Sequence, residues 1–308
     1  MARRRKGDPV HGWLILDKPS GITSTKAVGR LRHLFNAAKA GHAGTLDPLA
    51  TGVLPIGFGE ATKTMPFVVD GSKSYRFTVR FGAETATDDC EGEITQSSDT
   101  RPTRAEIEAA LPRFTGEISQ IPPRFSALKV DGARAYDLAR DNEDFELAAR
   151  TVTVDRLALI DMPDPDHAVI EADCGKGTYI RSIARDLARE LGALGHVSAL
   201  RRTRVGPFKE TDAISLEKLE ELGHSAADRE ALMGQLKPLE TALDDIPALA
   251  LSGQDAARLK RGQPVLIRGR DAPILNGPVY ATSRGLLVAV GEVKQGEMRP
   301  TRVFNLPG

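Results

Sequence analysis

Cysteine and long apolar runs are scarce in this chain of 308 residues. The two cysteines, Cys90 and Cys174, are far apart and lack metal-ligand spacing, so we expect reduced thiols rather than a disulfide or zinc site. No run approaches the ~18 consecutive apolar residues of a membrane span. The basic start at residues 3–6 is followed by no long apolar stretch, so an export signal is not expected. These features together predict a cytoplasmic protein without membrane association.

Net charge is also missing, because 42 Lys and Arg balance 42 Asp and Glu. The distribution is uneven instead. The stretch between Asp17 and Asp47 contains five Lys or Arg and no acid, residues 176–209 carry eight Lys or Arg, and residues 84–99 carry acids only. This segregation predicts one positive face suited to RNA phosphates, with the acids of 84–99 placed elsewhere. Solvated helix faces produce similar runs and remain the alternative.

Cofactor motifs are lacking as well. The sequence has no Walker loop, no Gly-x-Gly-x-x-Gly after a strand and no His/Cys cluster. We therefore expect no metal, nicotinamide or nucleotide cofactor.

The length exceeds what one core usually supports, since single cores stop growing near ~250–300 residues. We predict a basic N-terminal tail at residues 1–10, a catalytic domain at 11–245 and a small, mainly β unit at 246–308. Hydrophobic periodicity predicts strands at residues 12–16, 74–81, 151–160 and 167–172, and helices that begin near Ser24, Thr103 and Ile180, with a loop at residues 115–124.

Residues 41–52, Gly-His-Ala-Gly-Thr-Leu-Asp-Pro-Leu-Ala-Thr-Gly, concentrate the most chemistry. They contain His42, Asp47, Pro48 and three glycines. Pro48 pushes the backbone of Asp47 toward an extended conformation, which projects its short carboxylate from the chain. The pattern predicts a loop that presents one rigid acid. A turn whose carboxylate caps the following residues is the alternative.

Two further positions draw attention. Tyr75 begins an alternating row that faces the core with Phe77 and Val79. The alternative is that Tyr75 is only the solvent-exposed end of that row. Arg181 lies in the first turn of a predicted helix, where a cation opposes the helix dipole, so we expect an anionic partner and take Asp47 as the candidate. Burial raises the pKa of a carboxyl group and a guanidinium lowers it, so Asp47 needs such a partner to stay ionised. Arg185 and Arg189 should form surface pairs or phosphate contacts.

Several of these segments, in order, resemble motifs of the TruB-type pseudouridine synthases. They are residues 17–21 (Asp-Lys-Pro-Ser-Gly), 41–52, 74–75 (Ser-Tyr), 177–181 (Gly-Thr-Tyr-Ile-Arg) and 200–203 (Leu-Arg-Arg-Thr). The resemblance implies an α/β (α+β) fold with a mixed, largely antiparallel sheet and a small C-terminal β-rich domain like the RNA-binding PUA module. It also implies that residues 126–150 are an insertion that clamps RNA, although a plain surface hairpin would also suit them.

The resemblance assigns roles to nine residues. Asp47 would be the nucleophile, Arg181 its ion-pair partner, and Tyr75 would stack on the target base with proton transfer as a further role. The substrate-binding residues would be His42, which fills the gap left by the extruded base, with Lys18, Pro19, Tyr179, Leu200 and Arg202 shaping and lining the pocket.

The implied reaction is the conversion of uridine 55 in the T-arm loop of tRNA to pseudouridine. We expect the enzyme to bind the T-arm stem-loop as a monomer, without guide RNA. Two alternatives are a guide-RNA-dependent pseudouridine synthase subunit and a tRNA chaperone with no catalysis.

Overall fold

The computed structural model describes residues 7–126, 128–130, 132–141, 143, 145–223, 228–267 and 275–306. Residues 3–6 of the expected basic tail lie outside the described residues, as do residues 127, 131, 142 and 144 of the expected insertion.

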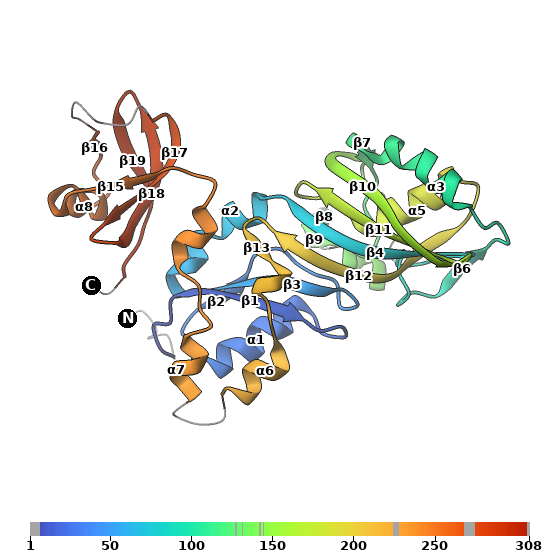
Figure 1. The fold of residues 1–308 in the computed structure, drawn as a ribbon, viewed down its shortest axis with the longest axis horizontal. Helices are drawn as coiled ribbons and strands as arrows, with labels where there is room; N and C mark the ends of the chain where they lie inside the picture. Colours follow the sequence, from blue (N-terminus) through green and yellow to red (C-terminus); the bar gives the residue numbers. More distant parts are fainter. Residues whose placement is uncertain are drawn as a thin grey trace.

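A ten-stranded mixed sheet forms the body of the molecule (Figure 1). Its order is β14-β1-β3-β12-β4-β11-β10-β7, with β2 beside β3 and β13 beside β12. The pairings of β1 with β14 and of β3 with β12 are parallel and the others described are antiparallel, which confirms the predicted sheet type. The strands are β1 (Gly12–Lys18), β2 (Ala40–His42), β3 (Thr51–Phe58), β4 (Lys73–Phe81), β7 (Gly116–Gln120), β10 (Arg150–Asp164), β11 (His167–Cys174), β12 (Gly195–Val205), β13 (Phe208–Lys209) and β14 (Ile214–Ser215).

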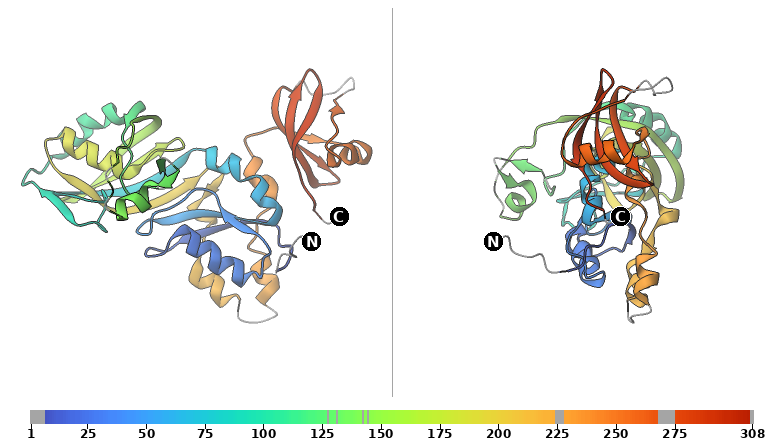
Figure 2. Two further views of the ribbon diagram at one scale, coloured as in Figure 1. Left: turned by 180° about the vertical axis from the view of Figure 1, so that it is seen from behind. Right: turned by 90° about the vertical axis from the view of Figure 1, so that its left-hand side faces the viewer.

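Helices cover the two ends of this sheet. Figure 1 shows α1 and α6 beside β1 to β3, and α3 and α5 beside β10 and β11, while β4 and β12 run through both halves (Figure 2). The remaining elements of the body are α1 (Ser24–Leu34), α2 (Met65–Asp70), α3 (Arg104–Ala110), α4 (Ala135–Arg140), α5 (Ile180–Glu190), α6 (Leu216–Glu221), α7 (Asp228–Met233), the hairpins β5 (Ala83–Thr85) to β6 (Ile94–Ser97) and β8 (Lys129–Val130) to β9 (Ala133–Arg134), and the 3-10 turns η1 (Gly59–Lys63), η2 (Leu111–Phe114), η3 (Glu210–Asp212) and η4 (Leu239–Leu243).

Local sequence signals explain several of these elements. Thr23 caps α1 by accepting a bond from the Lys26 N–H, and Thr103 and Glu106 form the predicted capping box of α3. On β4 the predicted alternation is confirmed, because Phe77 and the next two residues of the row are at most 2% exposed. The predicted loop at residues 115–124 is wrong in part, because residues 116–120 form the edge strand β7 against β10.

The C-terminal part forms a second sheet with its own core, in the order β15-β17-β18-β19-β16. Its elements are β15 (Ala248–Ala250), α8 (Gly253–Lys260), β16 (Val265–Leu266), β17 (Gly277–Ser283), β18 (Leu286–Lys294) and β19 (Glu297–Val303). Phe304 is fully buried in the same apolar cluster as Trp13 and Phe208 of the body. The segment that follows β19 therefore packs against the body at Phe304.

Of the helices in the described residues, none is long and apolar enough to cross a membrane.

Candidate active site

The loop between β2 and β3 carries Asp47, and two backbone anchors set its path. Leu46 is bonded through both its N–H and its carbonyl to the buried Ser24 hydroxyl, at 2.9 and 3.0 Å. Gly52 has a φ of +96°, and a Cβ there would lie 2.2 Å from the Arg202 carbonyl oxygen, so only glycine fits. The loop predicted from the sequence therefore has a defined shape. The side chain of Asp47 stays one-third exposed.

Lys18, the last residue of β1, also fixes the path of this loop. Its ammonium is fully buried and donates to the carbonyls of Pro19 at 2.9 Å, Ile22 at 2.9 Å and Pro48 at 3.2 Å. Burial lowers the pKa of Lys18 to about 8, although Asp47 opposes that shift. Lys18 thus joins the turn after β1 to the residue that follows Asp47.

Arg202 holds the other end of the loop. It is 1% exposed and donates to the carbonyls of Val53 at 2.8 Å, Gly44 at 3.0 Å and Thr45 at 3.3 Å. Sequence reasoning placed Arg202 among the substrate-binding residues. In the structure its guanidinium nitrogens are engaged by loop backbone, so it contributes by fixing the loop.

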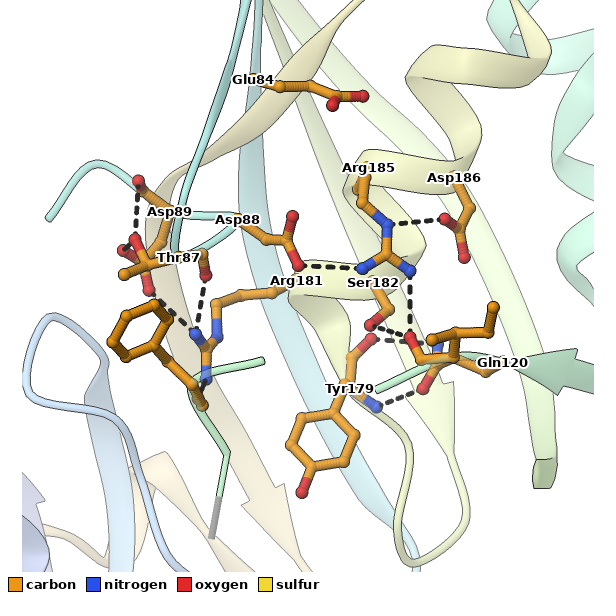
Figure 3. Close-up of polar contacts among 12 residues, drawn as sticks. Glu84, Thr87, Asp88, Asp89, Gln120, Tyr179, Arg181, Ser182, Arg185 and Asp186 are labelled. Carbon is orange, nitrogen blue, oxygen red and sulfur yellow. Dashed lines mark hydrogen bonds and ion pairs between the residues drawn. The ribbon is translucent and has the colours of Figure 1, made fainter. Parts of the chain in front are cut away.

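Arg181, from the first turn of α5, meets Asp47 directly. Its Nε lies 3.0 Å from Asp47 Oδ2, and its side chain is 4% exposed. Nη1 donates to the carbonyl of Thr87 at 2.7 Å and Nη2 to that of Phe125 at 2.9 Å. Figure 3 shows the guanidinium directed toward Thr87 and Asp89. The Nε–H is not aligned for a hydrogen bond, so its contact with Asp47 is a charge pair.

Burial and nearby charges set the ionisation of Asp47. Burial raises its pKa above the ordinary value, Arg181 and Lys18 lower it, and Asp89 raises it further. Because one-third of the side chain is exposed, solvent screens part of each effect. The two cations therefore favour the ionised form of this carboxylate, against the effects of burial and of Asp89.

Asp89 is a site residue that sequence reasoning missed. Its side chain is 3% exposed and its Oδ2 lies 3.3 Å from Arg181 Nη1. Its Oδ1 accepts bonds from the Thr87 hydroxyl and the Glu91 N–H. Arg181 therefore lies between two carboxylates, one buried and one partly exposed.

The expectation that the acids of residues 84–99 lie away from the basic residues is wrong. Asp88 pairs with Arg185, one turn along α5 from Arg181 (Figure 3). Glu84 pairs with Arg189, two turns along the same helix. The separation of charges along the sequence is cancelled by pairing in space. A usable signal was present, since acids at 84 and 88 repeat the four-residue spacing of the arginines.

Tyr75 and His42 are half-buried near the loop. Tyr75 lies opposite Arg202 in the β4–β12 ladder, and burial raises the pKa of its phenol despite the opposing effect of Arg202. Burial and Arg202 lower the pKa of His42, and its Nδ1 has no hydrogen-bond partner among the described residues. Both side chains are therefore neutral near neutral pH.

The other predicted pocket residues differ in exposure. Tyr179 caps the N-terminus of α5 and is half-buried, Leu200 on β12 is 8% exposed, and Pro19 is exposed. The Gln120 side chain binds both backbone polar groups of Tyr179. Its Oε1 accepts from the Tyr179 N–H at 2.8 Å, and its Nε2 donates to the Tyr179 carbonyl at 3.1 Å. Sequence reasoning also missed Gln120, which it placed in a loop.

Two hollows lie beside residues of the site. One of about 640 Å³ is lined by Glu84, Asp88, Arg185 and Arg189, and one of about 440 Å³ is lined by Lys18 and Pro19. Asp47 lines neither of these two, and its place is defined by its polar contacts.

Two family descriptions match consecutive parts of the chain. Residues 32–180 match "TruB family pseudouridylate synthase (N terminal domain)" and residues 181–244 match "tRNA pseudouridylate synthase B C-terminal domain". Both matches include site residues, because the first contains Asp47 and Tyr75 and the second begins at Arg181.

Similar curated proteins span nearly the whole chain. A "tRNA pseudouridine synthase B" of Bradyrhizobium diazoefficiens is 62% identical over 306 residues, which are 99% of this chain and 89% of that protein. One of the same name from Caulobacter vibrioides is 56% identical over 313 residues, covering 99% of this chain and all of that protein.

Solved structures share the fold. A chain in the crystal structure of a Cbf5-Nop10-Gar1 complex aligns with a TM-score of 0.75 at 24% identity, covering 99% of this chain and 90% of the other. A chain in an H/ACA RNP bound to a substrate RNA containing 2'-deoxyuridine aligns at 0.72 and 24%, covering 99% and 92%.

Proposed function

Because the chain belongs to the TruB family of pseudouridylate synthases, we propose that it isomerises uridine 55 in the T-arm loop of tRNA to pseudouridine, with no cofactor and no guide RNA. One observation carries the residue assignment. An acid on a fixed loop, Asp47, has its charge balanced by a guanidinium 3.0 Å away that comes from the other half of the sheet.

The reaction breaks the bond between N1 of uracil and C1' of ribose, turns the base, and joins C5 to C1' with loss of the C5 proton. It involves no net redox change. Asp47 acts as the nucleophile, attacking either C1' or C6 of the base, and both routes need its ionised form. Arg181 and Lys18 favour that form, because each lowers the pKa of Asp47 against the effect of burial.

The base must leave its stack before it can reach Asp47, which costs a few kcal/mol. Tyr75 stacks on the extruded base, and its neutral phenol is available for moving the C5 proton. His42 fills the space that the base vacates. Its neutral imidazole and its unpartnered Nδ1 suit a group that contacts RNA bases.

The remaining predicted residues support this arrangement. Lys18 and Arg202 position the loop through backbone carbonyls, while Pro19, Tyr179 and Leu200 line the approach to it. Residues 126–150 are proposed to clamp the RNA. They begin beside Phe125, whose carbonyl binds Arg181, so the clamp and the acid share a contact.

Independence from a guide RNA is supported by how similar this chain is to each group of relatives. The relatives at 56% and 62% identity are named as tRNA enzymes, whereas the chains from the Cbf5 and H/ACA complexes are 24% identical and share the fold alone. A tRNA chaperone without catalysis would not need Asp47 to be held ionised.

The test is Asp47→Asn, with Asp155→Asn on the exposed side of β10 as a matched control. Purified protein alone is incubated with tRNA and pseudouridine is mapped. We expect the wild type and the control to modify position 55, and Asp47→Asn to bind tRNA with no product. Product from Asp47→Asn would refute the nucleophile, and product only with added guide RNA would refute guide independence.

We assign residues 11–245 to catalysis and 246–308 to a second RNA-contacting unit. Truncation after Asp245 would remove Phe304 from the cluster around Trp13, so point substitutions test this division better. Changing the exposed Arg258 and Lys260 of α8 to Gln should weaken tRNA affinity while kcat stays near wild type. A fall in kcat with unchanged affinity would contradict the assignment.

A further inference from the structure

Arg150 is a partly buried cation that the proposed reaction does not use, and its Nε and Nη2 atoms are shielded from solvent. It is the last residue of the insertion and the first of β10, and it lies opposite Gln120 in the β7–β10 ladder. Its guanidinium carbon lies 5.0 Å from the centre of the Tyr179 ring, so the cation rests on the aromatic face. Tyr179 is two residues from Arg181, which places Arg150 at the edge of the candidate site.

Two nitrogens of this guanidinium are orphaned. Arg150 Nε and Nη2 are buried and have no hydrogen-bond acceptor among the described residues. A buried donor without an acceptor costs about 1–3 kcal/mol, and more when it is charged. Such groups are rare in folded proteins and call for a specific explanation.

Three other buried side-chain atoms of the described residues have no hydrogen-bond partner, and they are His42 Nδ1, Ser126 Oγ and Arg181 Nε. Arg181 Nε still has Asp47 Oδ2 as its charge partner at 3.0 Å. Arg150 forms no ion pair with the described residues, so its two nitrogens have neither kind of partner.

The identity of the two Arg150 atoms points to the ligand. The N–H of Nε and one N–H of Nη2 are parallel donors on a single edge of a guanidinium, and this fork matches two oxygens of one phosphate. We propose that Arg150 binds one backbone phosphate of the substrate RNA through this edge, with the Tyr179 ring covering its face. The proposal rests on the proposed function for the RNA itself.

Gln120 links the position of this phosphate to that of Arg181, because it fixes the residue just before α5. It fixes both the N–H and the carbonyl of Tyr179, and the Tyr179 ring points away from it (Figure 3). The Arg150 phosphate is thereby held at a set distance from the first turn of α5.

The first measurement is the affinity for a T-arm stem-loop RNA as a function of salt. Arg150→Met keeps the length and loses the charge, and Arg156→Met on the same strand is the control, because Arg156 is exposed and faces Asp173 at 3.5 Å. We expect Arg150→Met to weaken binding about tenfold or more and to reduce the slope of log K against log salt by roughly 0.7–0.9, the value of one phosphate. The control should match the wild type.

A second measurement identifies the phosphate. A set of stem-loops, each with one linkage replaced by an uncharged methylphosphonate, is bound to the wild type and to Arg150→Met. One linkage near the target uridine should weaken wild-type binding about tenfold and leave Arg150→Met unaffected. Equal losses in both proteins at every linkage would overturn the proposal.

Thermal stability separates binding from a structural role. Removing two buried donors that have no acceptor should leave Tm unchanged or raise it, whereas a structural Arg150 would make Arg150→Met less stable. A lower Tm together with no coupled linkage would overturn the proposal. Both measurements report binding, so a wild type that forms pseudouridine without any coupled linkage defeats only this inference, and a coupled linkage without pseudouridine defeats only the proposed reaction.

Discussion

Replacing Arg181 by Met should shift the pH dependence of catalysis, because this guanidinium lies between two carboxylates. Its Nε is 3.0 Å from Asp47 Oδ2 and its Nη1 is 3.3 Å from Asp89 Oδ2. The guanidinium lowers the pKa of Asp47 and Asp89 raises it. In the variant, Asp47 would lose the guanidinium that lowers its pKa and keep the Asp89 carboxylate that raises it.

The size of the shift follows from distance and exposure. Two unit charges 4 Å apart interact by about 1 kcal/mol in water and about 4 kcal/mol at the effective dielectric near a protein surface. Asp47 is one-third exposed, so a value between these limits applies. One pKa unit corresponds to about 1.4 kcal/mol, which gives a rise of roughly 1–2 units in the pKa of Asp47.

The proposed mechanism needs the ionised carboxylate, so the acid limb of the kcat/KM profile should move to higher pH by the same roughly 1–2 units. The assay is release of an isotopic label from C5 of the target uridine across the limb. Arg189→Met is the matched control, because Arg189 is on the same helix and pairs with Glu84 instead. A uniform loss of rate with an unmoved limb would refute the view that Arg181 acts through the ionisation of Asp47.

Three further predictions follow from the same structure. Asp89→Asn should move the acid limb to lower pH, opposite to Arg181→Met, and a shift to higher pH would mean that Asp89 acts mainly by holding Arg181. Burial lowers the pKa of Lys73 to about 8 from 10.5, so the unfolded chain keeps this proton longer and the unfolding free energy should rise with pH across that window, by up to about 3 kcal/mol. Denaturant titrations of Lys73→Met should lack this rise, and an identical profile would contradict it. Gly52→Ala should destabilise by more than about 1 kcal/mol in melting experiments, since its Cβ would meet backbone, and an unchanged Tm would show that the loop relaxes freely.

Sequence reasoning succeeded where the signal is local. The caps of α1 and α3, the alternation of β4 and the loop around Asp47 all depend on neighbours within a few residues. Proline, glycine and capping residues act on the backbone beside them, so their effects can be read without a fold.

The missed residues depend on contacts between distant segments. Asp89 belongs to the β5–β6 connection and Gln120 to an edge strand read as loop, and each gains its role from α5 more than fifty residues away. The family resemblance placed Arg202 among the residues that bind substrate, and in the structure it donates from the interior to the backbone carbonyls of Val53 and Gly44. A count of charges along a chain cannot show which of them neutralise one another.

The separation of Asp47 from Arg181 along the chain also affects biosynthesis. As the polypeptide leaves the ribosome, the acidic loop emerges first, and the helix that balances its charge follows after more than a hundred residues. A nascent chain that stops at Gly175 thus carries the acid without its cation and lacks β12, the strand that holds the loop. The ion pair between Asp47 and Arg181 can therefore form only after α5 has been synthesised.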